Sequence, residues 1–414
     1  MNQEDTNNQT GKPGPGELTF HQLYSFLLFS GVSFVSIYLP LVLRETGYSP
    51  KDIGFLLSVY NIVGLATILL CGRLLDALRC YRTLIFTGLL LAAFAFSRLL
   101  FPGNLAGSLF LIILLATSFL PQGSLIDSYI SARYQGLPQY YGRIRSMGSV
   151  GYIFFLGVAA VFEIFHPYDP WRLQTWVWGL FGLIILMFGG SSSASMRQIR
   201  AQAQAADIIP PDSAAKDTES ASSSQKTGIR ILGWPMIALL LSLIICWSII
   251  MGINSNFLAL YLREELHIRN INIFFIVATL SEIPIIFRSG RILYRKPLGW
   301  MLLLAFGAAL LRLLTYATLP YALPILLSQL LHSAAYGLFH ITVIALINHY
   351  FTKYRNTAIA IYAAIPTLSN SLGAMLGGIL IQEFGFIGFF RTFLFLVLPI
   401  FIPIFLMRRR FLNL

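Results

Sequence analysis

Long apolar stretches recur along almost the whole chain, and no other feature of the sequence constrains its fold as strongly. Of the 414 residues, 56% are hydrophobic and only 11% are charged, whereas soluble domains carry about 25% charged residues. A helix needs about 20 apolar residues to cross a bilayer. The bilayer offers no water to unpaired backbone groups, so such segments must be helices. The sequence therefore predicts an all-α polytopic membrane protein, whose twelve transmembrane helices cover residues 19–43, 52–75, 83–101, 107–132, 145–165, 172–190, 234–262, 270–293, 298–318, 321–349, 356–382 and 386–407.

Basic residues gather in the loops at one end of these predicted helices. If the N-terminus lies inside the cell, cytoplasmic segments hold 21 of the 29 Lys and Arg residues and outer segments hold six. Cytoplasmic loops of membrane proteins carry an excess of Lys and Arg, so both termini are predicted to lie in the cytoplasm, with the protein in the plasma (inner) membrane. The net charge of +12 is then a topology signal, and no nucleic-acid partner is expected.

A polar segment between the sixth and seventh predicted helices divides the chain into two halves. Residues 191–233 are rich in Ser, Ala, Gln and Asp, and such a composition cannot bury enough apolar surface to fold alone. We expect a disordered cytoplasmic tail (1–18), two six-helix halves (19–190 and 234–407), a cytoplasmic linker between them and a basic cytoplasmic tail (408–414). Two six-helix halves around a midplane site are typical of secondary transporters. No P-loop is found, which argues against direct use of ATP.

Two loops at corresponding places of the two halves carry glycine and basic residues. The first, Gly72-Arg73-Leu74-Leu75-Asp76, resembles the start of the G-x-L-x-D-R-x-G-R-R signature of the major facilitator superfamily, from which Ala77 and Arg79 depart. The second keeps the glycine and the bases but has Tyr294 in place of the acid. The alternative is a pair of ordinary basic loops. The resemblance implies a gating role for Gly72, Asp76, Arg143, Gly290 and Arg291.

The region of the fourth and fifth predicted helices carries the most specific motif. Asp127 is followed by Arg145 eighteen residues later and by Tyr152 after seven more. These separations resemble those of the lactose permease and phenylpropionate permease branch of the superfamily. The resemblance implies that the acid and the base bind substrate and that the aromatic ring stacks on it, which suits a polyhydroxy or carboxylate ligand. The alternative is a charge pair at the membrane edge, with Tyr152 packed in the bundle.

Three polar residues lie inside apolar stretches of the second half, where a charge costs about 2.5–3.5 kcal/mol on insertion scales. Glu282, Arg312 and His332 resemble the proton-coupling acid, arginine and histidine of lactose permease. The resemblance implies that Glu282 carries the proton and that Arg312 expels it. Ala335 stands where the family has a second acid, so coupling depends on Glu282 or is absent. The alternative is a structural salt bridge beside a core histidine.

Other polar side chains complete the predicted substrate site. Gln329, His332 and Tyr336 share one face of the tenth predicted helix. Asn254 and Asn256 lie on the seventh, and with Asn61 and Asn370 they could line a pathway or join helices by hydrogen bonds. The predicted substrate-binding set is Asp127, Arg145, Tyr152, Asn254, Asn256, Gln329, His332 and Tyr336.

These features together predict a secondary transporter that works by alternating access, a proton symporter importing a small polar solute. A sugar or glycoside is the first candidate, and an aromatic acid such as a phenylpropionate or a nucleoside is the second. A non-transporting membrane receptor or sensor is the alternative of another class. No nucleophile–base pair or metal cluster points to an enzyme. We expect no cofactor and no metal, the proton gradient as energy source, and a monomer in contact with the lipid bilayer.

Overall fold

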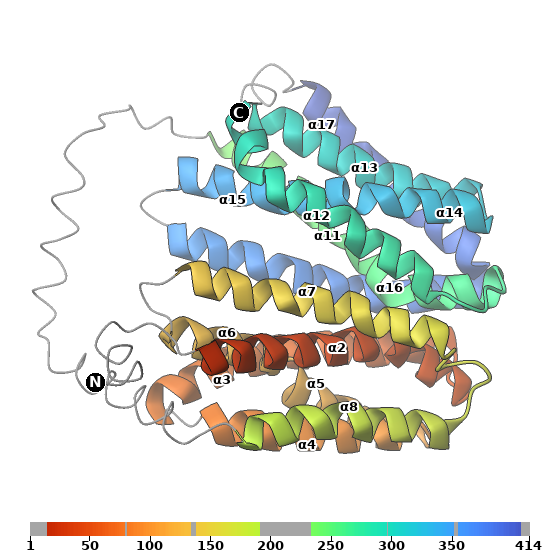
Figure 1. Cartoon of the computed structure of the whole chain (residues 1–414). Coiled ribbons are helices and arrows are strands. Elements are labelled where there is room, and N and C mark those ends of the chain that lie inside the picture. The colour runs from red at the N-terminus through yellow and green to blue at the C-terminus, as the bar shows by residue number, and fades with distance from the viewer. Residues whose placement is uncertain are drawn as a thin grey trace, which may run out of the picture.

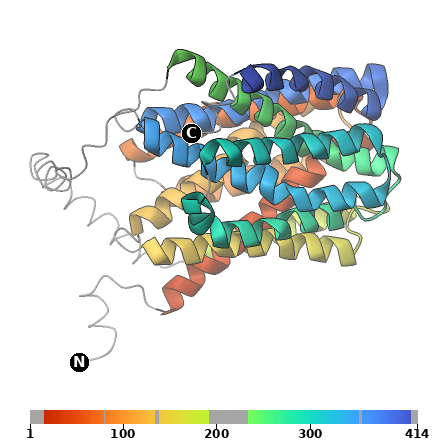
Figure 2. The ribbon, with the colours of Figure 1, turned by 90° about the horizontal axis from the view of Figure 1, so that it is seen from above.

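The computed structural model describes residues 15–78, 81–133, 138–190, 233–295, 297–351 and 355–406. These residues form helices and contain no strand, which confirms the all-α fold. Eight helical segments are long and apolar enough to cross a membrane. In two views the helices run roughly along a common direction (Figures 1 and 2), with those of the first half beside those of the second.

The first half contains seven helical segments that form six rods. Helices α2, α3, α6, α7 and α8 each begin at a proline, whose fixed φ suits the first helical turn and whose missing N–H is not needed there. Because Pro121 cannot donate to the ladder, α5 and α6 are separate helices within the predicted fourth span. The bounds are α2 (Pro15–Glu45), α3 (Pro50–Leu78), α4 (Tyr81–Leu99), α5 (Leu105–Phe119), α6 (Pro121–Arg133), α7 (Pro138–Val161) and α8 (Pro170–Gly190).

The second half also forms six rods, and three of them contain π-helical or 3₁₀-helical turns. Its segments are α11 (Trp234–Leu260), the π-helix η1 (Tyr261–Glu265), α12 (Asn272–Arg295), α13 (Leu298–Thr318), α14 (Ala322–Ser328), the 3₁₀-helix η2 (Gln329–Leu331), the π-helix η3 (Ser333–Leu338), α15 (Phe339–Tyr350), α16 (Arg355–Val397), the 3₁₀-helix η5 (Leu398–Ile400) and α17 (Phe401–Leu406). Helix α16 contains the eleventh span and the first part of the twelfth, which meet at Gly385, where φ is 67°. That left-handed conformation strains any residue with a Cβ. We call residues 322–350 span ten.

The predicted tail of residues 1–18 needs a correction at its end. Helix α2 begins at Pro15, so residues 15–18 are helical. Pro15 stands at the first helical position, and Glu17 in the first turn is favoured by the helix dipole. Residues 1–14, 191–232 and 408–414 lie outside the described part of the chain.

In the described part of the chain, three pairs of helices make the main contacts between the two halves. Helix α2 contacts α11, α3 contacts α16 and α7 contacts α12. The end of α8 and the beginning of α11, which flank the linker, lie at one end of the bundle (Figure 1), which we call the linker end. The other end, which we call the distal end, holds the loops at 46–49, 100–104 and 162–169. The candidate site lies between these ends, along the seam between the halves.

Candidate functional site

A cavity of about 420 Å³ lies between the two halves. Both halves contribute polar side chains to its wall, together with the rings of Phe29 and Tyr60. A ligand pocket of this size is ordinary for a small molecule. The polar residues that line it are Ser36, Asn61, Ser124, Asp127, Arg145, Ser255, Asn256 and Asn370.

Asp127 and Arg145 form an ion pair on the first-half wall of this cavity. Asp127 lies on α6 and Arg145 on α7, and the Arg145 Nε atom is 3.7 Å from the Asp127 Oδ1 atom. Their side chains are 33% and 42% exposed. The guanidinium also lies 4.1 Å from the centre of the Phe29 ring, a favourable cation–π geometry. The pair is therefore held in place and accessible from the cavity, as a substrate-binding pair must be.

Tyr152 does not lie among the residues that line the cavity. It is partly buried on α7 and packs against the hydrophobic core. It lies within electrostatic reach of Glu282 on the other half, consistent with the contact between α7 and α12. The sequence separation between Arg145 and Tyr152 does not predict this position near Glu282. It carries no information about which helix of the second half packs against α7.

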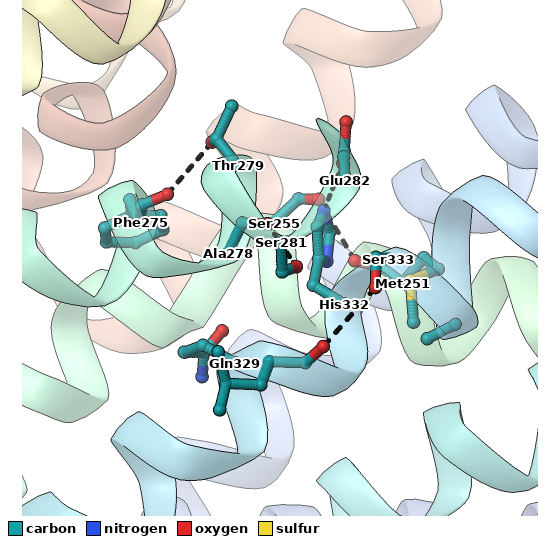
Figure 3. A network of polar contacts seen from close by, with 12 residues as sticks. Met251, Ser255, Phe275, Ala278, Thr279, Ser281, Glu282, Gln329, His332 and Ser333 are labelled. Carbon is teal, nitrogen blue, oxygen red and sulfur yellow. Dashed lines mark hydrogen bonds and ion pairs between the residues drawn. The ribbon is translucent and has the colours of Figure 1, made fainter. Parts of the chain in front are cut away.

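Glu282, His332 and Arg312 form a continuous hydrogen-bonded chain. The His332 Nε2 atom is 2.9 Å from the Glu282 Oε1 atom (Figure 3), and the Arg312 Nη1 atom is 2.9 Å from His332 Nδ1. A guanidinium only donates hydrogen bonds, so Nδ1 must accept. The hydrogen of the imidazole then lies on Nε2 and is donated to the Glu282 carboxylate. The three residues predicted for proton coupling are thus brought into contact.

Arg312 is held by neutral groups as well. It is 1% exposed, and its Nη2 atom donates to Gln329 Oε1 at 2.8 Å and to the Tyr316 hydroxyl at 3.2 Å. Gln329 also donates to that hydroxyl at 2.9 Å. Tyr316 was missed by sequence reasoning, although its position one helical turn after Arg312 places both on one face of α13.

Two partners of Arg312 lie in an irregular part of span ten. Gln329 lies in the 3₁₀-helix η2, and His332 lies between η2 and the π-helix η3. The rings of His332 and Tyr336 are parallel within 3°, with centres 5.6 Å apart. Tyr336 lies within electrostatic reach of both Glu282 and Arg145. It therefore lies near charged groups of both halves.

Three asparagines connect the halves across the cavity. Asn256 of α11 donates to Asn370 Oδ1 of α16 at 2.7 Å, and Asn370 donates to Asn61 Oδ1 of α3 at 3.3 Å. The two roles considered for them coincide, because they line the cavity and also join helices. The Asn254 side chain lies outside the described part of the structure.

The predicted gating residues remain largely untested. Gly72 and Asp76 lie in α3, and Gly290 and Arg291 lie in α12, but their side-chain surroundings are outside the described part of the structure. Arg143 lies on α7 with an exposed side chain. Their role in gating stays a prediction.

The distal end of the seam is closed by contacts between the halves. Arg44 Nε lies 2.5 Å from Glu264 Oε1, and Arg269 pairs with Glu163. Arg263 contacts His166 at 2.8 Å, and the Tyr38 hydroxyl donates to Asn272 Oδ1 at 2.9 Å. These contacts hold the two halves together at the distal end. None of them was predicted, because their members show no motif, and most of them lie in loops or at helix ends.

Known proteins share this architecture. The nucleoside transporter NupG matches with a TM-score of 0.72 and 14% identity, over 95% of this chain and 98% of that one. A mutant of the peptide transporter POT matches with 0.65 and 13%, over 96% and 93%. A bacterial homologue of the iron transporter ferroportin, in its inward-facing state, matches with 0.66 and 14%, over 93% and 97%. At these identities the likeness shows the fold alone.

Sequence comparison assigns the family. No curated protein matches the sequence. The MFS_1 like family matches over residues 19–392, which include the first half, most of the second half, the cavity and the hydrogen-bonded chain of Glu282, His332 and Arg312. The chain therefore belongs to the MFS_1 like family, and it is a membrane transporter of the major facilitator type.

Proposed function

We propose that this protein is a proton-coupled symporter, which imports a small polar solute by alternating access. The observation that carries the proposal is the chain from Arg312 through His332 to Glu282, which links a buried permanent cation to a titratable acid. Glu282 and His332 retain 22% and 25% side-chain exposure, so a proton can reach the acid. A buried charge costs desolvation free energy, and a scaffold without transport would gain nothing from it.

Protonation of Glu282 would change the charge balance around Arg312. While the carboxylate is ionised, the neutral imidazole of His332 transmits its attraction to the guanidinium. When a proton binds, Arg312 loses this balancing charge, and an arrangement that offers the guanidinium another partner becomes more favourable. A proton can then shift the equilibrium between two conformations, since it has a different affinity for each.

The cavity wall supports a small polar solute as substrate. Arg145 supplies donors, Asp127 supplies acceptors, and the three asparagine amides supply both. Phe29 and Tyr60 add aromatic surface, on which the apolar face of a sugar ring can pack. A sugar or glycoside, the substrate suggested by the resemblance to lactose permease, uses all of these groups and is the first candidate. Phenylpropionates and other aromatic acids would use Arg145 and Phe29.

A nucleoside is the second candidate, favoured by the linked amides of Asn61, Asn256 and Asn370. A nucleobase presents adjacent donors and acceptors, which side-chain amides match in pairs, while the ribose hydroxyls suit the Asp127–Arg145 pair. The nucleoside transporter NupG has the same fold. The matched peptide and iron transporters also share it, so fold alone does not select the substrate.

The same proposal includes the orientation of the bundle in the membrane. The excess of basic residues at the linker end favours a cytoplasmic location for that end and for both termini. The closed distal end would then face outward, and the cavity would open toward the cytoplasm in this conformation. We propose a monomer in the plasma (inner) membrane.

Purified protein in proteoliposomes tests this function. Labelled sugars, phenylpropanoids and nucleosides are offered with and without an imposed pH gradient, acidic outside, and with a protonophore as control. Accumulation of one class, driven by the gradient and abolished by the protonophore, is expected. Uptake that equilibrates without responding to the gradient would leave a transporter and overturn proton coupling. No uptake of any class would favour the receptor alternative.

A further inference from the structure

We infer that Trp247 is a positioning residue, which holds the irregular segment of span ten through the carbonyl of Ala335 and thereby aims His332 at Glu282 and Arg312. The effect on transport that this inference predicts rests on the proposed proton coupling. Its structural part, a hydrogen bond from α11 that fixes the register of span ten, stands on contacts outside the cavity.

The backbone of span ten changes its register near Ala335. In a regular α-helix the N–H of residue 339 donates to the carbonyl of residue 335. Here the Phe339 N–H donates to the Tyr336 carbonyl instead. The Trp247 Nε1 atom donates to the Ala335 carbonyl at 2.6 Å. A π-turn inside an α-helix takes a backbone carbonyl away from its usual N–H partner in the helix. Such a carbonyl then needs a donor from outside the helix.

The Trp247 side chain is built into this position. It is 2% exposed, and Ala335 is fully buried. The indole ring stacks on Phe339 with centres 4.2 Å apart and planes 6° apart, and it lies 5.9 Å from the Tyr336 ring. A buried indole N–H requires an acceptor, so the hydrogen bond is shielded from water and from competing partners.

The register of the segment decides where His332 points. One residue corresponds to a rotation of about 100° about a helix axis with 3.6 residues per turn. If η3 returned to α-helical register, the part of span ten before it would turn by about that angle relative to α15. Gln329 and His332 could not then both reach their partners on α13 and α12. The π-turn is therefore a condition for the chain from Arg312 to Glu282.

The same helix that carries Trp247 also reaches the central cavity. Asn256 lies nine residues further along α11, roughly 13 Å away at 1.5 Å per residue. Asn256 lines the cavity and donates to Asn370. A movement of α11 when substrate occupies the cavity would thus be transmitted to Ala335 and to His332. Trp247 gives substrate binding a direct mechanical connection to the proton site.

The test removes the indole donor and keeps the ring. Trp247→Phe retains stacking on Phe339, and replacement of Trp247 by benzothienylalanine retains nearly the whole shape and lacks only the N–H. The control is Trp300→Phe on α13, whose ring is 53% exposed. If Trp247→Phe does not insert stably, the isosteric replacement carries the test.

Hydrogen exchange measures the structural part without transport. Amides of residues 329–339 should exchange about tenfold faster when the donor is absent, as expected for one buried hydrogen bond left unmade. The Trp300→Phe control should exchange like the wild type. Unchanged exchange in both replacements of Trp247 would overturn the inference.

Transport measures the coupling part. The ratio of gradient-driven accumulation to exchange between equilibrated sides should fall about tenfold with the donor removed, and the pH profile of uptake should flatten. A normal ratio and profile, despite faster amide exchange, would overturn the positioning role. If the wild type itself shows no gradient-driven accumulation, the proposed function fails, and hydrogen exchange still decides whether Trp247 holds the segment.

Discussion

Arg312 is almost fully buried, and the hydrogen bonds described for it go to the neutral groups of His332, Gln329 and Tyr316. A permanent charge in such a place costs several kcal/mol unless another charge balances it. The Glu282 carboxylate lies one imidazole away. Replacement of Glu282 alone would therefore leave the buried Arg312 guanidinium without a balancing charge.

Replacement of Glu282 by Gln tests this at the proton site. The amide keeps an acceptor for the His332 N–H and cannot take up a proton. Gradient-driven accumulation should be lost, and substrate exchange between equilibrated sides should stay largely intact. Glu383→Gln, at an exposed acid on α16, is the matched control. Accumulation in the Glu282→Gln vesicles that still follows the pH gradient would assign the proton to another group.

Replacements of Asp127 and Arg145 test the substrate site. Asp127→Asn and Arg145→Lys should each weaken substrate binding by roughly 1.5–3 kcal/mol, the cost of a lost charged hydrogen bond, or about 10–150-fold in Kd. Equilibrium binding to detergent-solubilised protein measures this directly. Arg98→Lys, at an exposed position on α4, should bind normally. Unchanged affinity in both cavity variants would make the ion pair a structural one.

At the scale of helices, α3 and α16 approach each other so closely that side chains are excluded. A Cβ atom on Gly54 would lie 2.9 Å from the Cα atom of Gly378 and would overlap the Ala374 carbonyl oxygen. Backbone atoms cannot turn aside as side chains do. Small residues permit such contacts between membrane helices, and this one joins the halves near the distal end.

Gly54→Ala should therefore hold the distal end partly open. Overpacking costs about 1–3 kcal/mol, and 1–2 kcal/mol corresponds to about a 5–30-fold change in population. A cysteine introduced at Ser36, which lines the cavity, should react faster with an impermeant maleimide from the distal side, in a chain without native cysteines. Gly182→Ala, where a Cβ would meet open space, is the control. Equal labelling rates would show that this contact does not control closure.

At the scale of the whole molecule, ion pairs between the halves hold one end of the bundle together. Arg44 with Glu264 and Arg269 with Glu163 join the halves at the distal end. Exposed ion pairs of this kind contribute about 0–1 kcal/mol each, so the closed end can open without a large barrier from them. That weakness suits the proposed alternation between two states.

Reporter fusions test the orientation of the whole molecule. Fusions at residue 210 and at the C-terminus should both give cytoplasmic signals, because the basic residues are concentrated at the linker end. Fusions in the loop of residues 162–169 should give external signals and serve as the internal control. An external signal at residue 210 or at the C-terminus would contradict the predicted orientation.

Much of the fold could be predicted from the sequence because membrane insertion is a local property. About 20 apolar residues suffice to define a span, so the all-α fold and its two six-helix halves followed without knowledge of contacts. The pairing of Asp127 with Arg145 and the chain from Glu282 to Arg312 could also be anticipated. Charged groups inside apolar helices must find partners within the protein, and the predicted spans contain few polar groups that could serve as partners.

Tertiary structure alone decided which helix faces meet. A change of one residue in helical register turns a side chain by about 100°. No short segment of the sequence therefore predicts the position of Tyr152 near Glu282 or the change of register near Ala335. The hydrogen bond from Trp247 joins residues 88 positions apart, and the Asn61–Asn370 contact joins residues 309 apart. Such contacts depend on the packing of whole helices against one another, whereas the spans depend only on the bilayer around each of them.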